Sequence, residues 1–151
     1  MRAIVQRVTT SSVMVDEKVV GKIDKGLMIL VGFTYGDTIK DIEYMVKKIV
    51  NLRIFDDENG IMNKSILDVK GSVLSVSQFT LYANTKKGNR PSYIDALGGS
   101  EATILYDKFN ELLKEYVTLE KGIFGSEMFV SLVNDGPITI ILDSEGVKNV
   151  K

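Results

Sequence analysis

The sequence predicts an α+β fold, in which a largely antiparallel β-sheet, barrel-like or sandwiched, is packed by two main helices. Most apolar segments are short, rich in β-branched residues and joined by short turns. Only two longer segments show helical spacing of their apolar residues. The 151 residues, 44% hydrophobic and 26% charged, resemble an ordinary globular protein. We therefore expect a single domain over residues 1–151, with a core that needs no cross-links.

The first 33 residues predict four strands with short connections. Their sequences are RAIVQRV, SSVMV, VVGKI and GLMILVGF, and the turn DEK joins the second to the third. Asp37 and Thr38 then mark the start of a helix. The apolar residues that follow at helical spacing are Ile39, Ile42, Met45, Val46, Ile49 and Leu52.

Turns and strands are expected to alternate in the middle of the chain. DDENG at 56–60 predicts a turn, SILDV at 65–69 a short strand, and SVLSVSQFTLY at 72–82 a long one. Residues 83–99 form a polar connection, after which Ser100 is expected to cap a second helix. The apolar residues of that helix are Ile104, Leu105, Phe109, Leu112, Leu113 and Val117. Strands of sequence VTLEK, MFVSLV and ITIILD complete the chain.

The chain contains no His and no Cys, which excludes several kinds of catalysis. Without His there is no Ser-His or Cys-His pair and hardly any zinc site, and without Cys there is no disulfide or thiolate. No carboxylate cluster has the spacing of metal ligands, so we expect neither a metal nor a cofactor. Any chemistry therefore depends on hydroxyls, amides, carboxylates, lysines, main-chain groups or the substrate itself.

The charge balance and the hydropathy set further limits. The 19 basic and 20 acidic residues leave a formal charge of −1, whereas nucleic-acid binders usually carry a basic excess. A local basic patch would still be enough for phosphate contacts. No apolar run approaches the roughly 20 residues that span a bilayer, and the segment MRAIVQRV lacks the features of a secretory signal. We expect a cytoplasmic protein without membrane contact.

The segment SQFT, which comprises Ser77, Gln78, Phe79 and Thr80, is the first candidate site. On a continuous strand, Ser77 and Phe79 would face one side of the sheet, and Gln78 and Thr80 the other. Such residues most often form only the polar face of a half-buried sheet. A Ser or Thr nucleophile needs a base, and no His is present. The functional interpretation is that main-chain amides at the strand end and the Gln78 amide act as oxyanion donors.

The loop NTKKGNRPSY carries the second candidate group, Lys86, Lys87 and Arg90. No acidic residue lies between Asn84 and Ile94. Most charged loops are simply solvated. As a functional site, these three cations would follow a phosphate backbone, with a nearby tyrosine available for stacking on a base.

The segment NDGPIT interrupts an otherwise strand-like sequence with Gly136 and Pro137. Most such segments are reverse turns between two strands. Glycine permits a positive φ and proline restricts its own φ, so the pair defines a stiff and unusual backbone. A turn of this kind would point carbonyl oxygens outward, where they would accept hydrogen bonds from a ligand ammonium group.

Taken together, these segments resemble the D-aminoacyl-tRNA deacylase family, also called D-tyrosyl-tRNA deacylases. The resemblance covers essentially the whole chain, and SQFT together with GPxT is specific where each alone is weak. The segments that carry it, in family order, are MRAIVQRV, GLMILVGF, KIVNLRIFDDENG, MNKSILDV, VSQFTLYA, KGNRPSYIDA, FGSEM and LVNDGPIT.

The resemblance implies hydrolysis of the ester that joins a D-amino acid to the 3′ end of tRNA. It implies catalysis at Ser77, Gln78, Phe79 and Thr80, with the substrate 2′-OH assisting water and amides near Phe79 stabilising the oxyanion. Thr80 as a nucleophile ranks second.

The resemblance also implies a homodimer in which Gly136 and Pro137, in a cis peptide, reach into the partner's active site and reject L-aminoacyl groups. Arg7 and Thr139 would support that loop. Glycine has no side chain and would not be rejected, so glycyl-tRNA is an expected second substrate.

Two alternatives remain open at this stage. The first is a non-catalytic RNA-binding module of the same fold, which the missing His favours. The second is the related deacylase that holds Gly-Pro in trans and removes L-alanine from tRNA.

Overall fold

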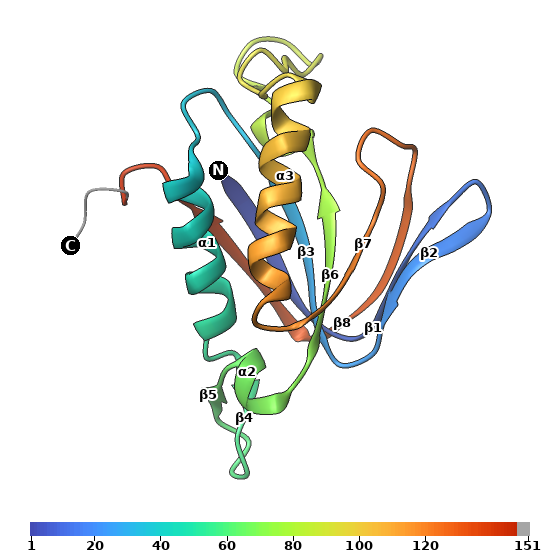
Figure 1. The fold of residues 1–151 in the computed structure, drawn as a ribbon, viewed down its shortest axis with the longest axis vertical. Helices are drawn as coiled ribbons and strands as arrows, with labels where there is room; N and C mark the ends of the chain where they lie inside the picture. Colours follow the sequence, from blue (N-terminus) through green and yellow to red (C-terminus); the bar gives the residue numbers. More distant parts are fainter. Residues whose placement is uncertain (148–151) are drawn as a thin grey trace.

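The computed structural model describes residues 1–147, and its main element is a six-stranded mixed sheet (Figure 1). The strand order is β2-β1-β3-β6-β7, and β8 pairs with the other edge of β1. The strands are β1 (Arg2–Val15), β2 (Lys18–Ile23), β3 (Gly26–Gly32), β6 (Ser72–Ser77), β7 (Thr118–Lys121) and β8 (Phe129–Asp143). Because β2 also lies beside β6 and β7, the sheet is nearly closed.

The sheet is antiparallel around β1 and parallel at its other end. β1 pairs antiparallel with β2, β3 and β8, whereas β3 pairs parallel with β6 and β6 with β7. Each parallel pair needs a crossover connection, and the two long helices lie in these crossovers. The α+β prediction is confirmed. That prediction did not specify the parallel pairing in one half of the sheet.

Two main helices, α1 (Ile39–Asn51) and α3 (Gly99–Lys114), lie side by side over one face of the sheet (Figure 1). The core between them and the sheet includes Ala3, Val5, Leu27, Ile29, Ile42, Met45, Ile49, Tyr106, Phe109 and Leu113. A second buried cluster fills the opposite face, inside the curled sheet, with Val8, Val13, Ile23, Met28, Leu74 and Val76. Most of the apolar residues predicted at helical spacing are buried or half-buried, but the prediction is wrong for Ile39 and Ile104, which are 42% and 69% exposed, and it missed the buried Tyr106.

The shorter elements are α2 (Ile66–Val69), a 3₁₀ turn η1 (Phe79–Tyr82), and a hairpin of β4 (Phe55–Asp56) and β5 (Met62–Lys64). The strand predicted at SILDV is wrong, because this segment forms α2. The Ser65 hydroxyl accepts the Asp68 amide at 3.2 Å, and the Asp68 carboxylate accepts the Ser65 amide at 2.9 Å. This reciprocal cap stabilises a helical turn against the β preference of Ile and Val.

The helix starts agree with the sequence at α1 and differ at α3. Thr38 caps α1, and its amide donates to Asp41 Oδ2 at 2.8 Å. At α3 the N-cap is Gly98 rather than Ser100, because the carbonyl of Gly98 already accepts the amide of Ala102 at 2.9 Å. Within the described residues, no helix combines the length and apolarity needed to cross a membrane.

Three strand predictions are corrected. RAIVQRV and SSVMV form one strand, β1, because β8 pairs along nearly all of it. MFVSLV and ITIILD likewise form one strand, β8, which continues past the Gly-Pro pair as a bulge. The strand predicted for 72–82 ends at Ser77.

Candidate active site

The SQFT segment lies where β6 ends and η1 begins. The main-chain amide of Gln78 donates to Val31 O at 2.7 Å, and the Leu81 amide donates to Gln78 O at 3.3 Å. The turn packs closely on β3, since a Cβ on Gly32 would lie 2.7 Å from Gln78 O. The strand alternation expected for these residues is therefore wrong, because the chain turns directly after Ser77.

This turn leaves two main-chain amides at its start. The hydrogen bond from Leu81 to Gln78 is the first of η1, so the amides of Phe79 and Thr80 precede it and have no acceptor within the turn. The side-chain amide of Gln78 donates to Thr80 Oγ1 at 2.5 Å. The Phe79 side chain is 55% exposed. Two neighbouring N–H groups at an exposed turn could bind a developing oxyanion.

A cavity of about 280 Å³ opens beside this turn. Its lining residues are mainly apolar and come from β3, β6, the start of α3 and the segment before β8. They are Val31, Gly32, Phe33, Val76, Ser77, Gln78, Phe79, Leu97, Ala102, Phe124, Gly125, Ser126, Met128 and Val130. An apolar cavity with a few polar groups at its rim suits an amino-acid side chain or a base. The contribution of residues 124–130 to this cavity was not predicted from the sequence, although FGSEM, at 124–128, is one of the segments that carry the resemblance.

The basic loop is connected to the same turn through an aromatic contact. The rings of Phe79 and Tyr93 meet edge to face, with centroids 5.1 Å apart. Lys86, Lys87 and Arg90 are all exposed on the connection between η1 and α3. The structure therefore brings the predicted cationic loop to the same end of the molecule as SQFT.

Gly136 and Pro137 form a bulge in the middle of β8. Asn134 stands opposite Val8 and Thr139 opposite Gln6, so that four residues of β8 face one residue of β1. The Gly136–Pro137 peptide bond is cis, and both residues are exposed. Gly136 has φ +127°, and a Cβ there would lie 2.7 Å from the Ile138 side chain. Only glycine fits this backbone without strain.

The bulge is held from both sides by side chains. The Ile138 amide donates to Asn134 Oδ1 at 3.0 Å, and Asn134 Nδ2 donates to Thr139 Oγ1 at 3.1 Å. Gln6 Nε2 also donates to Thr139 Oγ1, at 3.3 Å. Thr139, predicted as a supporting residue, therefore lies within this hydrogen-bond network.

Arg7 is the single β1 residue that faces the bulge, and it is buried. Its Nε donates to Asp135 O at 3.2 Å and lies 3.3 Å from Asp135 Oδ2. Its Nη1 donates to Ile54 O at 2.7 Å and lies 3.4 Å from Asp56 Oδ1. The planar guanidinium thus joins the bulge to the chain that follows α1.

The two predicted halves of the site do not meet within one chain. Arg7, which faces the bulge, pairs with Leu27 at one end of β3, whereas Ser77 pairs with Val31 near the other end. Four residues of a strand span roughly 13 Å, and β8 and β6 are also separated by β1 and β3. The bulge and the SQFT turn are therefore separated both along the strands and across the sheet.

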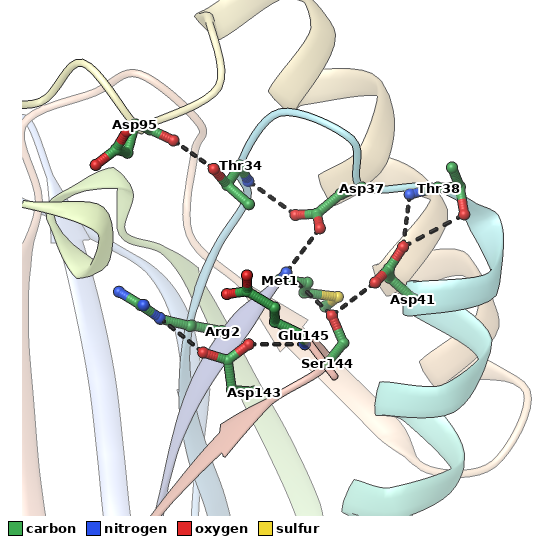
Figure 2. A network of polar contacts seen from close by, with 10 residues as sticks. All are labelled: Met1, Arg2, Thr34, Asp37, Thr38, Asp41, Asp95, Asp143, Ser144 and Glu145. Carbon is green, nitrogen blue, oxygen red and sulfur yellow. Dashed lines mark hydrogen bonds and ion pairs between the residues drawn. The ribbon is translucent and has the colours of Figure 1, made fainter. Parts of the chain in front are cut away.

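A polar network near the SQFT turn was not predicted from the sequence (Figure 2). The α-ammonium of the buried residue Met1 lies 2.7 Å from Asp37 Oδ1 and donates to Ser144 Oγ at 3.0 Å. Ser144 Oγ in turn donates to Asp41 Oδ1 at 2.7 Å, at the start of α1. Thr34 joins this network to the loop before α3, because its hydroxyl donates to Asp95 O at 2.6 Å.

Arg2 extends this network to η1. Its Nη1 donates to Leu81 O at 3.0 Å, its Nε donates to Asp143 Oδ2 at 2.9 Å, and its guanidinium lies 4.5 Å from the centroid of the Tyr82 ring. Burial would raise the pKa of Asp143, but the hydrogen bond from Arg2 and the Glu145 amide hold that pKa below its ordinary value. Burial raises the pKa of Tyr82, so this phenol stays neutral. Arg2, the first residue of β1, therefore stabilises the turn that carries SQFT.

The described residues contain no group of three or more acidic side chains arranged to hold a metal ion. The groups that the site offers are main-chain amides, the Gln78 amide, two hydroxyls and the bulge carbonyls. They can bind polar groups and stabilise charge in an ester hydrolysis.

The chain was compared with known proteins. The family model described as D-Tyr-tRNA(Tyr) deacylase matches residues 4–143. A D-aminoacyl-tRNA deacylase of Clostridium novyi (strain NT) is 55% identical over 146 residues, which cover 96% of this chain and 98% of that protein.

Two solved structures are similar over nearly the whole chain. One is described as c-Myc DNA Unwinding Element Binding Protein, with 41% identity, a TM-score of 0.90, and coverage of 95% of this chain and 98% of that one. The other is a probable eukaryotic D-amino acid tRNA deacylase, with 16% identity, a TM-score of 0.80, and coverage of 93% and 97%. The second likeness concerns the fold alone.

Proposed function

The chain belongs to the D-Tyr-tRNA(Tyr) deacylase family and is a hydrolase of the aminoacyl-tRNA ester bond, and on this premise we propose how it selects and cleaves its substrate. Each active site combines the SQFT turn of one subunit with the Gly136–Pro137 bulge of a second copy. Main-chain atoms of the bulge select D-aminoacyl groups. The enzyme works in the cytoplasm on the 3′ end of charged tRNA.

One observation carries this proposal: both halves of the site are exposed, and they lie apart within one chain. The bulge faces Arg7 of β1, which pairs with Leu27 of β3, whereas Ser77, directly before the turn, pairs with Val31. A second copy of the chain, related to the first by a two-fold axis, would bring each bulge to the partner's turn.

The free edge of β8 supports a dimer. Among the described strands β8 pairs only with β1, and an unpaired edge readily accepts another chain. This strand exposes large apolar side chains, with 63% of Phe129, 54% of Val133 and 73% of Ile141 accessible. Exposed apolar groups in this number are typical of an interaction surface.

The chemistry needs little from side chains. Water attacks the ester carbonyl carbon, and the amides of Phe79 and Thr80 stabilise the negative oxygen. The bond to the ribose oxygen then breaks, that oxygen takes up a proton, and the products are the amino acid and free tRNA. The neighbouring 2′-OH assists the attacking water, so no histidine is required.

The bulge determines which enantiomer is cleaved. The carbonyl oxygens of Gly136 and Pro137 accept hydrogen bonds from the substrate α-ammonium, and an L side chain then collides with the Gly-Pro backbone. Glycyl-tRNA carries no side chain that could collide, so it is also cleaved.

The test compares tRNA charged with D-Tyr, L-Tyr, Gly or L-Ala. We expect hydrolysis of the D-Tyr and Gly esters, and rates for both L esters at least a hundredfold lower, which corresponds to about 2.7 kcal/mol in transition-state energy. Pro137→Ala should reduce that preference, whereas Ser131→Ala, an exposed change on the same strand, should keep it. Faster cleavage of L-Ala-tRNA would favour the related L-alanyl deacylase instead.

The subunit arrangement has its own test. Sedimentation velocity at assay concentration should detect a dimer, and dilution that produces monomers should abolish activity. Full activity in a proven monomer would contradict the shared active site.

A further inference from the structure

A basic groove lies on the outer surface of the molecule, at the C-terminal end of α1. It has a volume of about 390 Å³ and is lined by Tyr44, Lys47, Lys48, Asn51, Leu52 and Arg53, which we call the α1 groove. Lys47, Lys48 and Arg53 are exposed, and Lys48 Nζ lies 5.9 Å from the centroid of the Tyr44 ring. Within residues 1–147 none of the three cations forms a salt bridge. The groove therefore presents three cations, without a salt bridge among these residues, next to an aromatic ring.

The α1 groove is joined to the Gly-Pro bulge through Arg7. Arg53 precedes Ile54, whose carbonyl accepts Arg7 Nη1 at 2.7 Å. The Nε of the same guanidinium donates to Asp135 O, directly before Gly136, at 3.2 Å. One side chain thus spans the distance from the end of the groove to the bulge.

The α1 groove lies far from the SQFT turn of its own chain. Figure 1 shows the C-terminal end of α1 near α2 and β4, at the opposite end of the molecule from the loop before α3. That loop carries Lys86, Lys87 and Arg90 and contacts the turn through Tyr93. The chain therefore has one basic surface beside each half of the proposed site.

We propose that the α1 groove of one subunit binds the phosphates of the acceptor stem of the tRNA whose 3′ end lies in the partner's active site, an inference that rests on the proposed function. If a bulge enters the partner's site, its own α1 groove accompanies it. Each site is then flanked by the basic loop of one subunit and the α1 groove of the other. A charged tRNA extends beyond its terminal ester as a helix with one phosphate per nucleotide, and clustered lysines and arginines are the usual partners of such phosphates.

The first test measures binding of tRNA as a function of salt. Lys47→Gln combined with Lys48→Gln should lower affinity, and should reduce the slope of log affinity against log salt by about 2, which is about 1 for each lost phosphate contact. The matched control is Lys18→Gln combined with Lys22→Gln, two exposed lysines of β2 that remove the same charge. An equal change of slope in both double variants would overturn the proposal, because only net charge would then matter.

A second readout separates stem binding from damage to the fold. The ratio of kcat/KM on D-Tyr-tRNA to kcat/KM on D-tyrosyl-adenosine, which has no stem, should fall about tenfold in the groove variant. Thermal melting should show that the variant is folded. An unchanged ratio in a folded variant would overturn the proposal.

Heterodimers decide which subunit supplies the groove. One subunit lacks Gly136–Pro137, and the other carries Phe79→Pro, so that only the site with the first subunit's turn and the second subunit's bulge is complete. Lys47→Glu with Lys48→Glu placed in the second subunit should lower kcat/KM on tRNA about tenfold, and placed in the first subunit less than twofold.

The outcomes separate the two proposals. An inactive heterodimer with unchanged grooves would contradict the shared active site itself. Alternatively, an active heterodimer responds only to charge reversal in the first subunit, or to charge reversal in neither subunit. Either outcome would support the shared active site and would overturn the proposed role of the α1 groove.

Discussion

The guanidinium of Arg7 donates to the main-chain oxygen of Asp135 at 3.2 Å, on the residue that precedes Gly136. Arg7 is buried, and its other end is anchored on Ile54 O at 2.7 Å. Arg7 therefore links the position of the bulge to the segment that follows α1. The same side chain contributes to the stability of the fold and, in the proposed function, to the selection of substrate.

Arg7→Lys should weaken both properties. A lysine keeps the charge, but its single nitrogen cannot hold both carbonyls as the planar guanidinium does. We expect the free energy of unfolding to fall by about 1–3 kcal/mol, as for loss of hydrogen bonds to a buried charged group. The D-to-L preference should fall about tenfold or more. Urea denaturation measures the change in stability, and rates on D-aminoacyl and L-aminoacyl esters measure the preference. Arg90→Lys, on the exposed loop, is the control. An unchanged D-to-L preference in Arg7→Lys would exclude a role for Arg7 in positioning the bulge.

Phe79→Pro should remove one proposed oxyanion donor. Proline is tolerated at the first position of a helical turn, and the backbone of Gln78 (φ −147°, ψ 86°) lies outside the α region that is disfavoured before proline. Loss of the N–H should lower kcat about a hundredfold or more. Phe79→Ala keeps the N–H and removes the ring, so it is the matched control. Equal losses in the two variants would point to the ring, and not the amide, as the catalytic contribution.

Thr80→Ala should have only a small effect. The Thr80 hydroxyl accepts the Gln78 side chain, and no histidine is present to activate it as a nucleophile. We expect a loss of a few-fold in kcat, under about 1 kcal/mol. Single-turnover rates measure this directly, and a thousandfold loss would instead identify Thr80 as the nucleophile.

Asp37→Asn should destabilise the protein strongly. The Asp37 side chain is 3% exposed and faces the α-ammonium of Met1, a residue that is 1% exposed. Neutralising one partner of a buried ion pair leaves the other charge unpaired, with a cost of about 3–5 kcal/mol. Chemical denaturation measures the loss. Glu43→Gln, an exposed change on α1, should cost less than about 0.5 kcal/mol, and equal effects of the two changes would refute the buried pair.

Asp143→Asn should alter the pH dependence of stability. The pKa of Asp143 is below its ordinary 3.8 in the folded protein, so the carboxylate stabilises the fold above that pH. The contribution disappears as the pH falls through the lowered folded value. The difference in unfolding free energy between the original chain and the variant should therefore be largest near pH 7 and shrink below about pH 4. A difference that stays constant down to pH 3 would contradict this.

Much of the fold follows from the sequence because the pattern of apolar residues is local. The spacing from Ile42 to Ile49 describes the buried face of α1, and the helix begins after Thr38 as predicted. The resemblance also singled out SQFT and Gly136–Pro137, whose roles in catalysis and selection stay predictions. These features depend on neighbours a few residues away, which a linear pattern can express.

Tertiary contacts decided where these segments end and where they lie. β6 stops at Ser77 because the Gln78 amide bonds to Val31 and the turn packs on Gly32, and neither contact is visible in the local sequence. The buried pair of Met1 and Asp37 likewise joins residues 36 positions apart.

The sequence by itself determined the two main helices and most of the strand-forming segments, the absence of histidine chemistry and the two motifs. Only the tertiary structure decided that the motifs lie apart in the sheet of one chain. The reason is the register of β1, which pairs with β8 through Gln6 and Thr139, and with β3 through Arg7 and Leu27. This register is determined by side chains packed across strands, so it depends on the whole core rather than on either motif.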